Sequence, residues 1–184
     1  MKKIILIAAA ALMTVSASAQ KFAHVNFNEL IMLMPAADSA RAQMAASQQE
    51  AQDTYKSMTD EFQVKYQQYQ QKSSTWTPAI RESKEKELTD IQTRIQDFDQ
   101  SIQQELQQQQ QQLMAPIQQR AVAAVEKLAK EGGYIYVFEK ASMLYVDETQ
   151  SVDLTPAARK ALNIPDGRTL ETLQQELQAQ SQKQ

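Results

Sequence analysis

The chain has 184 residues, of which 42% are hydrophobic, which is enough for one domain with a core. It holds three glycines, five prolines and no cysteine, which disfavours a loop-rich or all-β fold and excludes disulfides and cysteine-linked lipids. The formal net charge is −3, and an acidic chain is a poor candidate for binding nucleic acid or anionic lipid.

The first residues predict a secretory signal peptide over residues 1–19. Two lysines precede an apolar run from Ile4 to Val15 that is too short to span a bilayer comfortably, and Ala17-Ser18-Ala19 fits the small-x-small cleavage pattern. Cleavage before Gln20 removes two of the 19 basic residues, which leaves 17 against 22 acidic ones and a net charge of −5. We therefore expect the mature chain to act outside the cytoplasm.

Three segments predict strands, at residues 22–27, 134–138 and 143–147. The last two flank Glu139–Ser142 and together predict a β-hairpin. A three-stranded sheet is too small to be stable unless its apolar faces are covered, so we expect an oligomer assembled through this body. The residues expected in its interface are Val25, Phe27, Ile135, Val137, Leu144 and Val146.

Two long helices are predicted between the first and second strands, over residues 36–72 and 78–130. Their apolar residues recur at steps of three and four, with one double step across Ser47 and Gln48. The segment "KSSTWTPAI" separates them, and because this turn is short the helices must run antiparallel as one hairpin over about 36–130. Counting outward from the turn gives the expected neighbours: Phe62 with Leu88, Met58 with Ile91 and Tyr55 with Ile95.

The glutamine-rich segment "QELQQQQQQLMAPIQQR", Gln104 to Arg120, is predicted to be helical. Leu106 and Leu113 stand two stripe steps apart, so the apolar register passes through the run intact. A flexible break is the alternative. Pro116 removes one backbone hydrogen bond from this helix and is predicted to bend it and to act as a hinge. Gly132-Gly133 then ends the helix.

Aromatic and methionine side chains gather near the end of the predicted hairpin. They suit adaptable contacts with varied clients, but residues on the apolar stripe equally suit the seam between the two helices. The candidate client-binding residues are Met58, Phe62, Tyr66, Tyr69 and Trp76. The charged residues from Arg81 to Glu87 are expected to form a solvated face with salt bridges between neighbours.

The residue types needed for common catalytic and metal sites are scarce. There is no cysteine, and the single histidine, His24, falls in a strand expected to pack in the body. No glycine-rich phosphate loop is present, since Gly132-Gly133 reads as a helix stop. We therefore predict no enzyme activity, no metal site and no cofactor.

The end of the chain predicts short helices. In "LTPAARKALNI", Thr155 is expected to cap a helix that has Pro156 in its first turn. Residues 165–184 are expected to form a short helix through Leu170, Leu173 and Leu177, followed by a frayed tail.

The order of these motifs resembles the Skp/OmpH family of periplasmic chaperones. The stretch "KFAHVNFNELIMLMPAADSARAQM" is similar to the family's opening strand, V-N pair (Val25-Asn26) and proline-led helix. "LMAPIQQRAVAAVEKLAKEGGYIYVFEKASMLYVD" is similar to its return helix, with Pro116-Ile117 and the glycine-tyrosine entry Gly133-Tyr134. "YVDETQSVDLTPAARKALN" is similar to its closing D-x-T and L-N segment, so the resemblance extends to about Ile164.

The resemblance implies an α+β, mostly α fold: a β-rich trimerisation body carrying three helical tentacles around a cavity, shaped like a jellyfish. It implies one chaperone domain over residues 20–164 that works in the periplasm as a homotrimer, holds unfolded outer-membrane proteins without ATP and prevents their aggregation. The acidic charge departs from the basic pattern of the best-known members and argues against contact with lipopolysaccharide or a membrane surface. The alternative is a structural or adaptor coiled-coil protein of the cell envelope.

Overall fold

The computed structural model describes residues 21–182, so the predicted signal peptide lies outside the described part of the chain. The described residues divide into two compact units. The hairpin unit comprises residues 35–118, and the body unit comprises residues 21–34 together with residues 119–182. The structure is mostly helical with one small three-stranded sheet, which confirms the predicted fold class.

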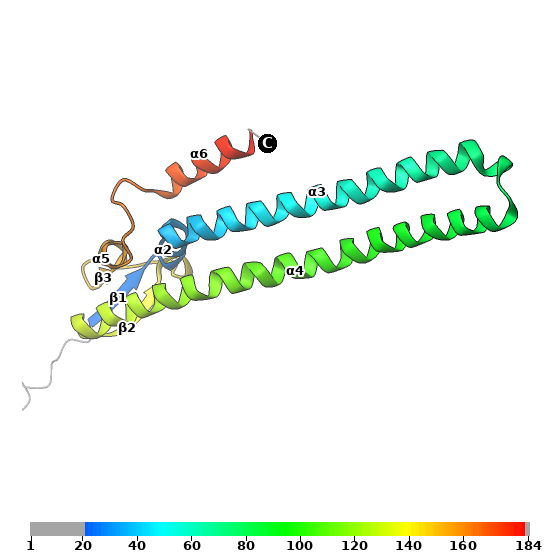
Figure 1. Cartoon of the computed structure of the whole chain (residues 1–184). Helices are drawn as coiled ribbons and strands as arrows, with labels where there is room; N and C mark the ends of the chain where they lie inside the picture. Colours follow the sequence, from blue (N-terminus) through cyan, green and yellow to red (C-terminus); the bar gives the residue numbers. More distant parts are fainter. Residues whose placement is uncertain (1–20, 183–184) are drawn as a thin grey trace, which may run out of the picture. The chain divides into compact units, whose positions relative to one another are not determined.

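Two long helices form the hairpin unit. Helix α3 covers Pro35–Lys72, a single 3-10 turn covers Ser73–Thr75, and helix α4 covers Pro78–Gly132 and continues into the body unit. Figure 1 shows α3 and α4 side by side and antiparallel, joined by the turn drawn in green. The glutamine-rich run is helical throughout, as its apolar register predicts, and α4 contains Pro116 without a break.

Polar contacts between α3 and α4 fix the register of the hairpin. Lys65 pairs with Glu87, and Arg94 Nη2 lies 2.9 Å from Glu61 Oε2. Phe62 is bracketed by these two contacts, which place it nearer the level of Ile91 than that of Leu88. The predicted register was therefore wrong by about one helical turn, because counting outward from the turn could not tell how many residues the 3-10 turn takes up.

The sheet of the body unit is wholly parallel. Strands β1 (Lys21–Val25), β2 (Tyr134–Glu139) and β3 (Ser151–Asp153) lie in the order β2-β1-β3. The central strand is buried at three successive residues, Ala23, His24 and Val25. Burial on both faces is usual for parallel strands, and it explains why His24 is buried together with both of its neighbours.

The predicted β-hairpin was wrong. Residues 143–147 form no strand, and β2 pairs with β1 instead of with the chain that follows it. Met143 to Val146 are apolar at every position, so they carry no alternation that would fix a register. Asp147 then opens a turn: its carboxylate accepts a hydrogen bond from Thr149 N at 2.9 Å, and its carbonyl accepts one from Ser151 N at 2.9 Å. The turn delivers the chain to the opposite edge of β1, where β3 pairs.

The first strand is also shorter than the predicted 22–27. It ends at Val25 because Asn26 caps a short helix, α2 (Phe27–Leu33), which the sequence analysis did not predict. The Asn26 side chain accepts a hydrogen bond from Glu29 N at 3.1 Å, which satisfies a free N–H of the first turn. Phe27 is thus a helical residue.

Two further helices, α5 (Thr155–Ala161) and α6 (Leu170–Ser181), complete the body unit. Helix α2 contacts both of them, and Leu173 of α6 is buried as the predicted apolar spacing suggests. Gly133, just beyond α4, has φ +67°, a conformation that glycine adopts at little cost at helix ends. Of the helices in residues 21–182, none combines the length and the apolar character needed to cross a membrane.

Candidate functional site

The apolar stripes of the hairpin unit meet along a seam that leaves most of their side chains half-buried. On α4, Ile91 is only 3% exposed and Ile117 only 4%, but the other large members of the stripe retain partial exposure. These half-buried side chains are Leu88, Ile95, Phe98, Ile102, Leu106 and Leu113. One seam between two helices cannot bury a whole apolar side chain at every turn, so the hairpin offers water a long line of partly accessible apolar surface.

The five candidate client-binding residues do not form one cluster. Phe62 stacks on Tyr66 with ring centroids 5.9 Å apart, and Tyr69 meets Trp76 edge-to-face, also at 5.9 Å. Tyr66 is 41% exposed, whereas the other four, including Met58, are half-buried. The two ring pairs are therefore separate from each other, and each is partly exposed to water.

A network of ion pairs crosses the seam at the tip of the hairpin, defined here as residues 56–94. Glu87 pairs with Lys65 of α3 and, at 2.8 Å, with Lys84 of α4. Hydrogen bonds from these two lysines lower the pKa of Glu87 to about 2. The sequence analysis foresaw salt bridges between neighbours on α4, but not the bridge to α3, since that bridge depends on the register of the hairpin.

A cavity of about 440 Å³ opens in the seam between the tip and residue 118. Small side chains of α3, Ser47, Ala51 and Thr54, line one side of it, and large apolar side chains of α4 line the other. The large ones are Phe98, Ile102 and Leu106. Ser47 falls at the double step in the apolar pattern, which was the only sequence signal of this gap.

The residues predicted to form an oligomer interface lie in different surroundings of the body unit. Val25, Phe27 and Val137 line a cavity of about 490 Å³ together with Val122 and Val125 of α4. Ile135 is 49% exposed on β2, Val146 is half-buried, and Leu144 is fully exposed in the segment that was predicted to be a strand.

Further apolar side chains of the body unit stand open to water beside these. On β2, Tyr136 is 60% exposed and Phe138 is 45% exposed, and on the segment after it Tyr145 is 80% exposed. These three are not among the interface residues expected from the sequence.

The buried His24 ties β1 to β3. Its Nδ1 lies 2.9 Å from Ser151 Oγ, and its Nε2 lies 3.8 Å from Asp153 Oδ2. Burial acts to raise the pKa of Asp153, but hydrogen bonds from Thr155 lower it on balance. The imidazole of His24 is 1% exposed, and its two nitrogens face the Ser151 hydroxyl and the Asp153 carboxylate. The three side chains therefore link β1 to β3 and do not present a solvent-accessible nucleophile.

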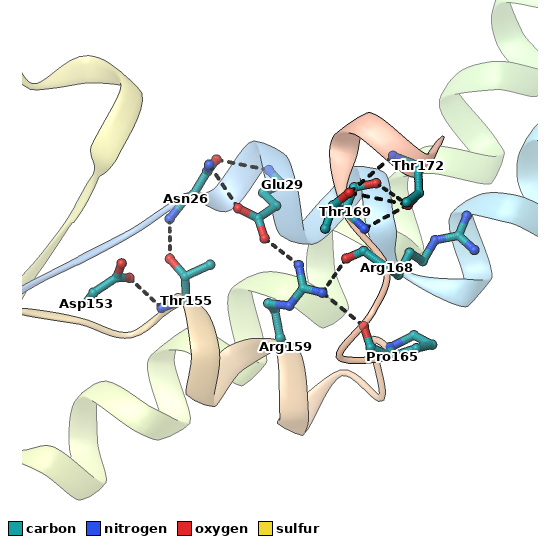
Figure 2. A network of polar contacts seen from close by, with 9 residues as sticks. All are labelled: Asn26, Glu29, Asp153, Thr155, Arg159, Pro165, Arg168, Thr169 and Thr172. Atoms are coloured by element: carbon teal, nitrogen blue, oxygen red, sulfur yellow. Dashed lines mark hydrogen bonds and ion pairs between the residues drawn. The ribbon is translucent and has the colours of Figure 1, made fainter. Parts of the chain in front are cut away.

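Two motif segments far apart in the sequence meet beside α2. Asn26 N donates to Thr155 Oγ1 at 2.9 Å, and Thr155 N donates to Asp153 Oδ1 at 2.8 Å, as Figure 2 shows. Thr155 was expected to cap α5 with its side chain. Instead it is the first helical residue, and its hydroxyl accepts the hydrogen bond from Asn26 N. The V-N pair and the D-x-T segment are thus structural partners.

An arginine clamp, which sequence reasoning missed, holds the chain between α5 and α6. Arg159 pairs with Glu29 of α2 at 2.5 Å and donates to the carbonyls of Pro165, at 3.0 Å, and Arg168, at 2.5 Å (Figure 2). A lone arginine in a helix gives no sequence signal of such a role. In residues 21–182, no group of three or more histidine, aspartate or glutamate side chains is arranged to hold a metal ion.

The described residues thus form a body unit with a small parallel sheet and a hairpin unit of two long helices. The sequence matches the family described as "Outer membrane protein (OmpH-like)" over residues 21–162, and the chain belongs to this family. The family is one of periplasmic chaperones for outer-membrane proteins, not of enzymes. No curated protein was found to match the chain.

Proposed function

We propose that this chain is an ATP-independent holdase that binds unfolded outer-membrane proteins in the periplasm after export and keeps them from aggregating. The observation that carries the proposal is the half-buried apolar seam of the hairpin unit. Each seam residue presents too little surface to hold a client alone, but a line of them gives many weak contacts, so a bound chain stays mobile while it is kept from other unfolded chains.

The active form proposed here is a homotrimer joined through the body unit. The exposed apolar side chains of β2 and of residues 143–146 support a contact with other copies of this chain. Among residues 21–182, no further strand pairs with either outer edge of the sheet, since β2 and β3 each pair only with the central β1. Three hairpins carried by one such body would surround a shared space in which a client is held.

The mass of the chaperone–client complex tests this proposal. A urea-unfolded outer-membrane β-barrel protein is diluted into buffer containing the mature chain, and the products are separated by size and weighed by light scattering. We expect a soluble species with the mass of three chains and one client, in which the client lacks the circular dichroism of a folded barrel. A client found only in aggregates, with the chain eluting alone, would show instead a scaffolding protein of the envelope.

A further inference from the structure

The charges of the hairpin unit are distributed unevenly along its length. We name residues 42–55 of α3 and 95–118 of α4 the middle belt; it contains Glu50, Asp53, Asp97, Asp99 and Glu105 but no lysine or arginine. The tip, in contrast, carries both signs and pairs them across the seam, as Lys65 does with Glu87. The negative charge of the protein is thus concentrated, unneutralised, in the middle of the hairpin.

The cavity in the seam lies in this middle belt. Glu50 and Glu105 line it together with Phe98, Ile102 and Leu106. A second hollow, of about 650 Å³, shares Glu50 and Thr54 with the first and extends over α3 to Asp53 and Met58. We name the two adjoining hollows together the belt groove; apolar side chains and carboxylates both contribute to its lining.

The belt groove exists because small residues of α3 face large residues of α4. Ser47, Ala51 and Thr54 are too short to fill the space opposite the three apolar side chains of α4. Gln109 Nε2 donates to Ser47 Oγ at 2.9 Å and ties the two helices together at the groove. The seam is therefore held by a polar contact there while the apolar space stays open.

The carboxylates of the groove have no cationic partner among residues 21–182. Among the ion pairs formed by residues 21–182, none involves Glu50, Asp53 or Glu105. Asp53 accepts a hydrogen bond from the neutral amide of Gln49 at 3.0 Å. A cation brought by another molecule would meet these carboxylates without displacing a lysine or an arginine.

We infer that the belt groove binds extended client segments in which a bulky apolar side chain is flanked by lysine or arginine. The apolar side chain enters the space over Phe98, Ile102 and Leu106, and the flanking cations pair with Glu50, Asp53 and Glu105. The inference rests on the proposed function and specifies the clients: segments rich in lysine and arginine are held more tightly than equally apolar acidic ones.

Two dye-labelled peptides with the same apolar residues, one flanked by lysines and one by glutamates, test the groove in the full mature chain. Fluorescence anisotropy at low salt should show the lysine peptide binding about fivefold more tightly, since each exposed charge pair contributes little alone. The double variant Glu50→Gln/Glu105→Gln should bring the ratio close to one. Glutamine keeps the helix propensity, and unchanged helical circular dichroism checks the fold.

The matched control removes two charges of the same belt outside the groove. Asp97→Asn/Asp99→Asn should leave most of the preference for the lysine peptide, and Ala51→Leu should weaken both peptides by filling the cavity. The groove is refuted if the wild-type chain has no preference, or if the two double variants lower it equally. Suppression of barrel aggregation by the wild-type chain is measured in parallel and distinguishes the two proposals. Suppression of aggregation without a preference for the lysine peptide overturns the groove alone. A preference for the lysine peptide without suppression of aggregation overturns the holdase function.

Discussion

The backbone N–H of Asn26 donates to the hydroxyl of Thr155, 2.9 Å away, and so joins residues that stand 129 positions apart in the sequence. Between them lies the whole hairpin. Asn26 lies between β1 and α2, and Thr155 is the first residue of α5, just after β3. The hydrogen bond thus joins a segment of the body unit that precedes the long helices to one that follows them.

Replacing Thr155 by valine should destabilise the body unit by about 1–2 kcal/mol, because valine has the shape of threonine but leaves the N–H of Asn26 without its acceptor. Urea unfolding followed by circular dichroism measures the change. Thr155→Ser keeps the hydroxyl and is the control. A loss confined to Thr155→Ser, with none in Thr155→Val, would mean that the methyl packing, and not the hydrogen bond, matters at this position.

The arginine clamp should decide how firmly α6 is held. Arg159→Lys loses the planar group that reaches Glu29 and two carbonyls at once, so we expect faster amide hydrogen exchange in residues 163–173. Glu29→Gln is the matched control, since it removes the ion pair but spares the contacts to the carbonyls of Pro165 and Arg168. Exchange accelerated equally by both changes would assign the effect to the ion pair alone.

The stability of the tip should fall in acid. The pKa of Glu87 is lowered in the folded chain to about 2, so its ion pairs stabilise the hairpin above the ordinary glutamate pKa and are lost as the pH falls from about 4.5 toward 2. Because the pairs are partly exposed, the effect is modest. The single tryptophan, Trp76, lies at the tip and reports its unfolding by fluorescence.

Glu87→Gln should flatten this dependence between pH 5 and pH 2. Glu82→Gln, five residues away on an exposed part of the same helix, should leave it in place, since Glu82 takes part in none of the ion pairs described above. Identical acid profiles for wild type and Glu87→Gln would contradict the role given to the Lys65–Glu87–Lys84 network.

Pro116 should be the weakest point of α4. It has no N–H to donate to the carbonyl of Gln112, so Pro116→Ala should stiffen the helix, slow amide exchange around residues 112–120 and stabilise the chain by up to about 3 kcal/mol. If the hinge prediction holds, the variant should also accept a narrower range of client sizes. Unchanged amide exchange and an unchanged range of client sizes would show that Pro116 is not a hinge.

The long helices could be predicted from the sequence because their signal repeats many times. The apolar spacing before the glutamine run continues in register from Leu106 to Leu113. It therefore predicts helical backbone through the glutamines between them. The sheet could not be predicted in the same way. Met143 to Val146 show no alternation, and the turn at Asp147 depends on a side-chain hydrogen bond that competes with strand pairing.

Parts of the candidate site were hidden for a different reason. The Lys65–Glu87 pair and the belt groove depend on how α3 and α4 are offset, and an error of one turn in the predicted register changes every partner. The clamp at Arg159 joins α2 with the chain after α5, a contact between segments 130 residues apart. Sequence spacing within one helix cannot reveal a contact that only the tertiary fold creates.

The aggregation of an unfolded client tests the central claim most directly. A urea-unfolded outer-membrane β-barrel protein is diluted into buffer with and without the mature chain, in the absence of nucleotide, and light scattering is followed. We expect scattering to be suppressed at about one trimer per client. Scattering that is unaffected even by a large excess of the chain would contradict the holdase function.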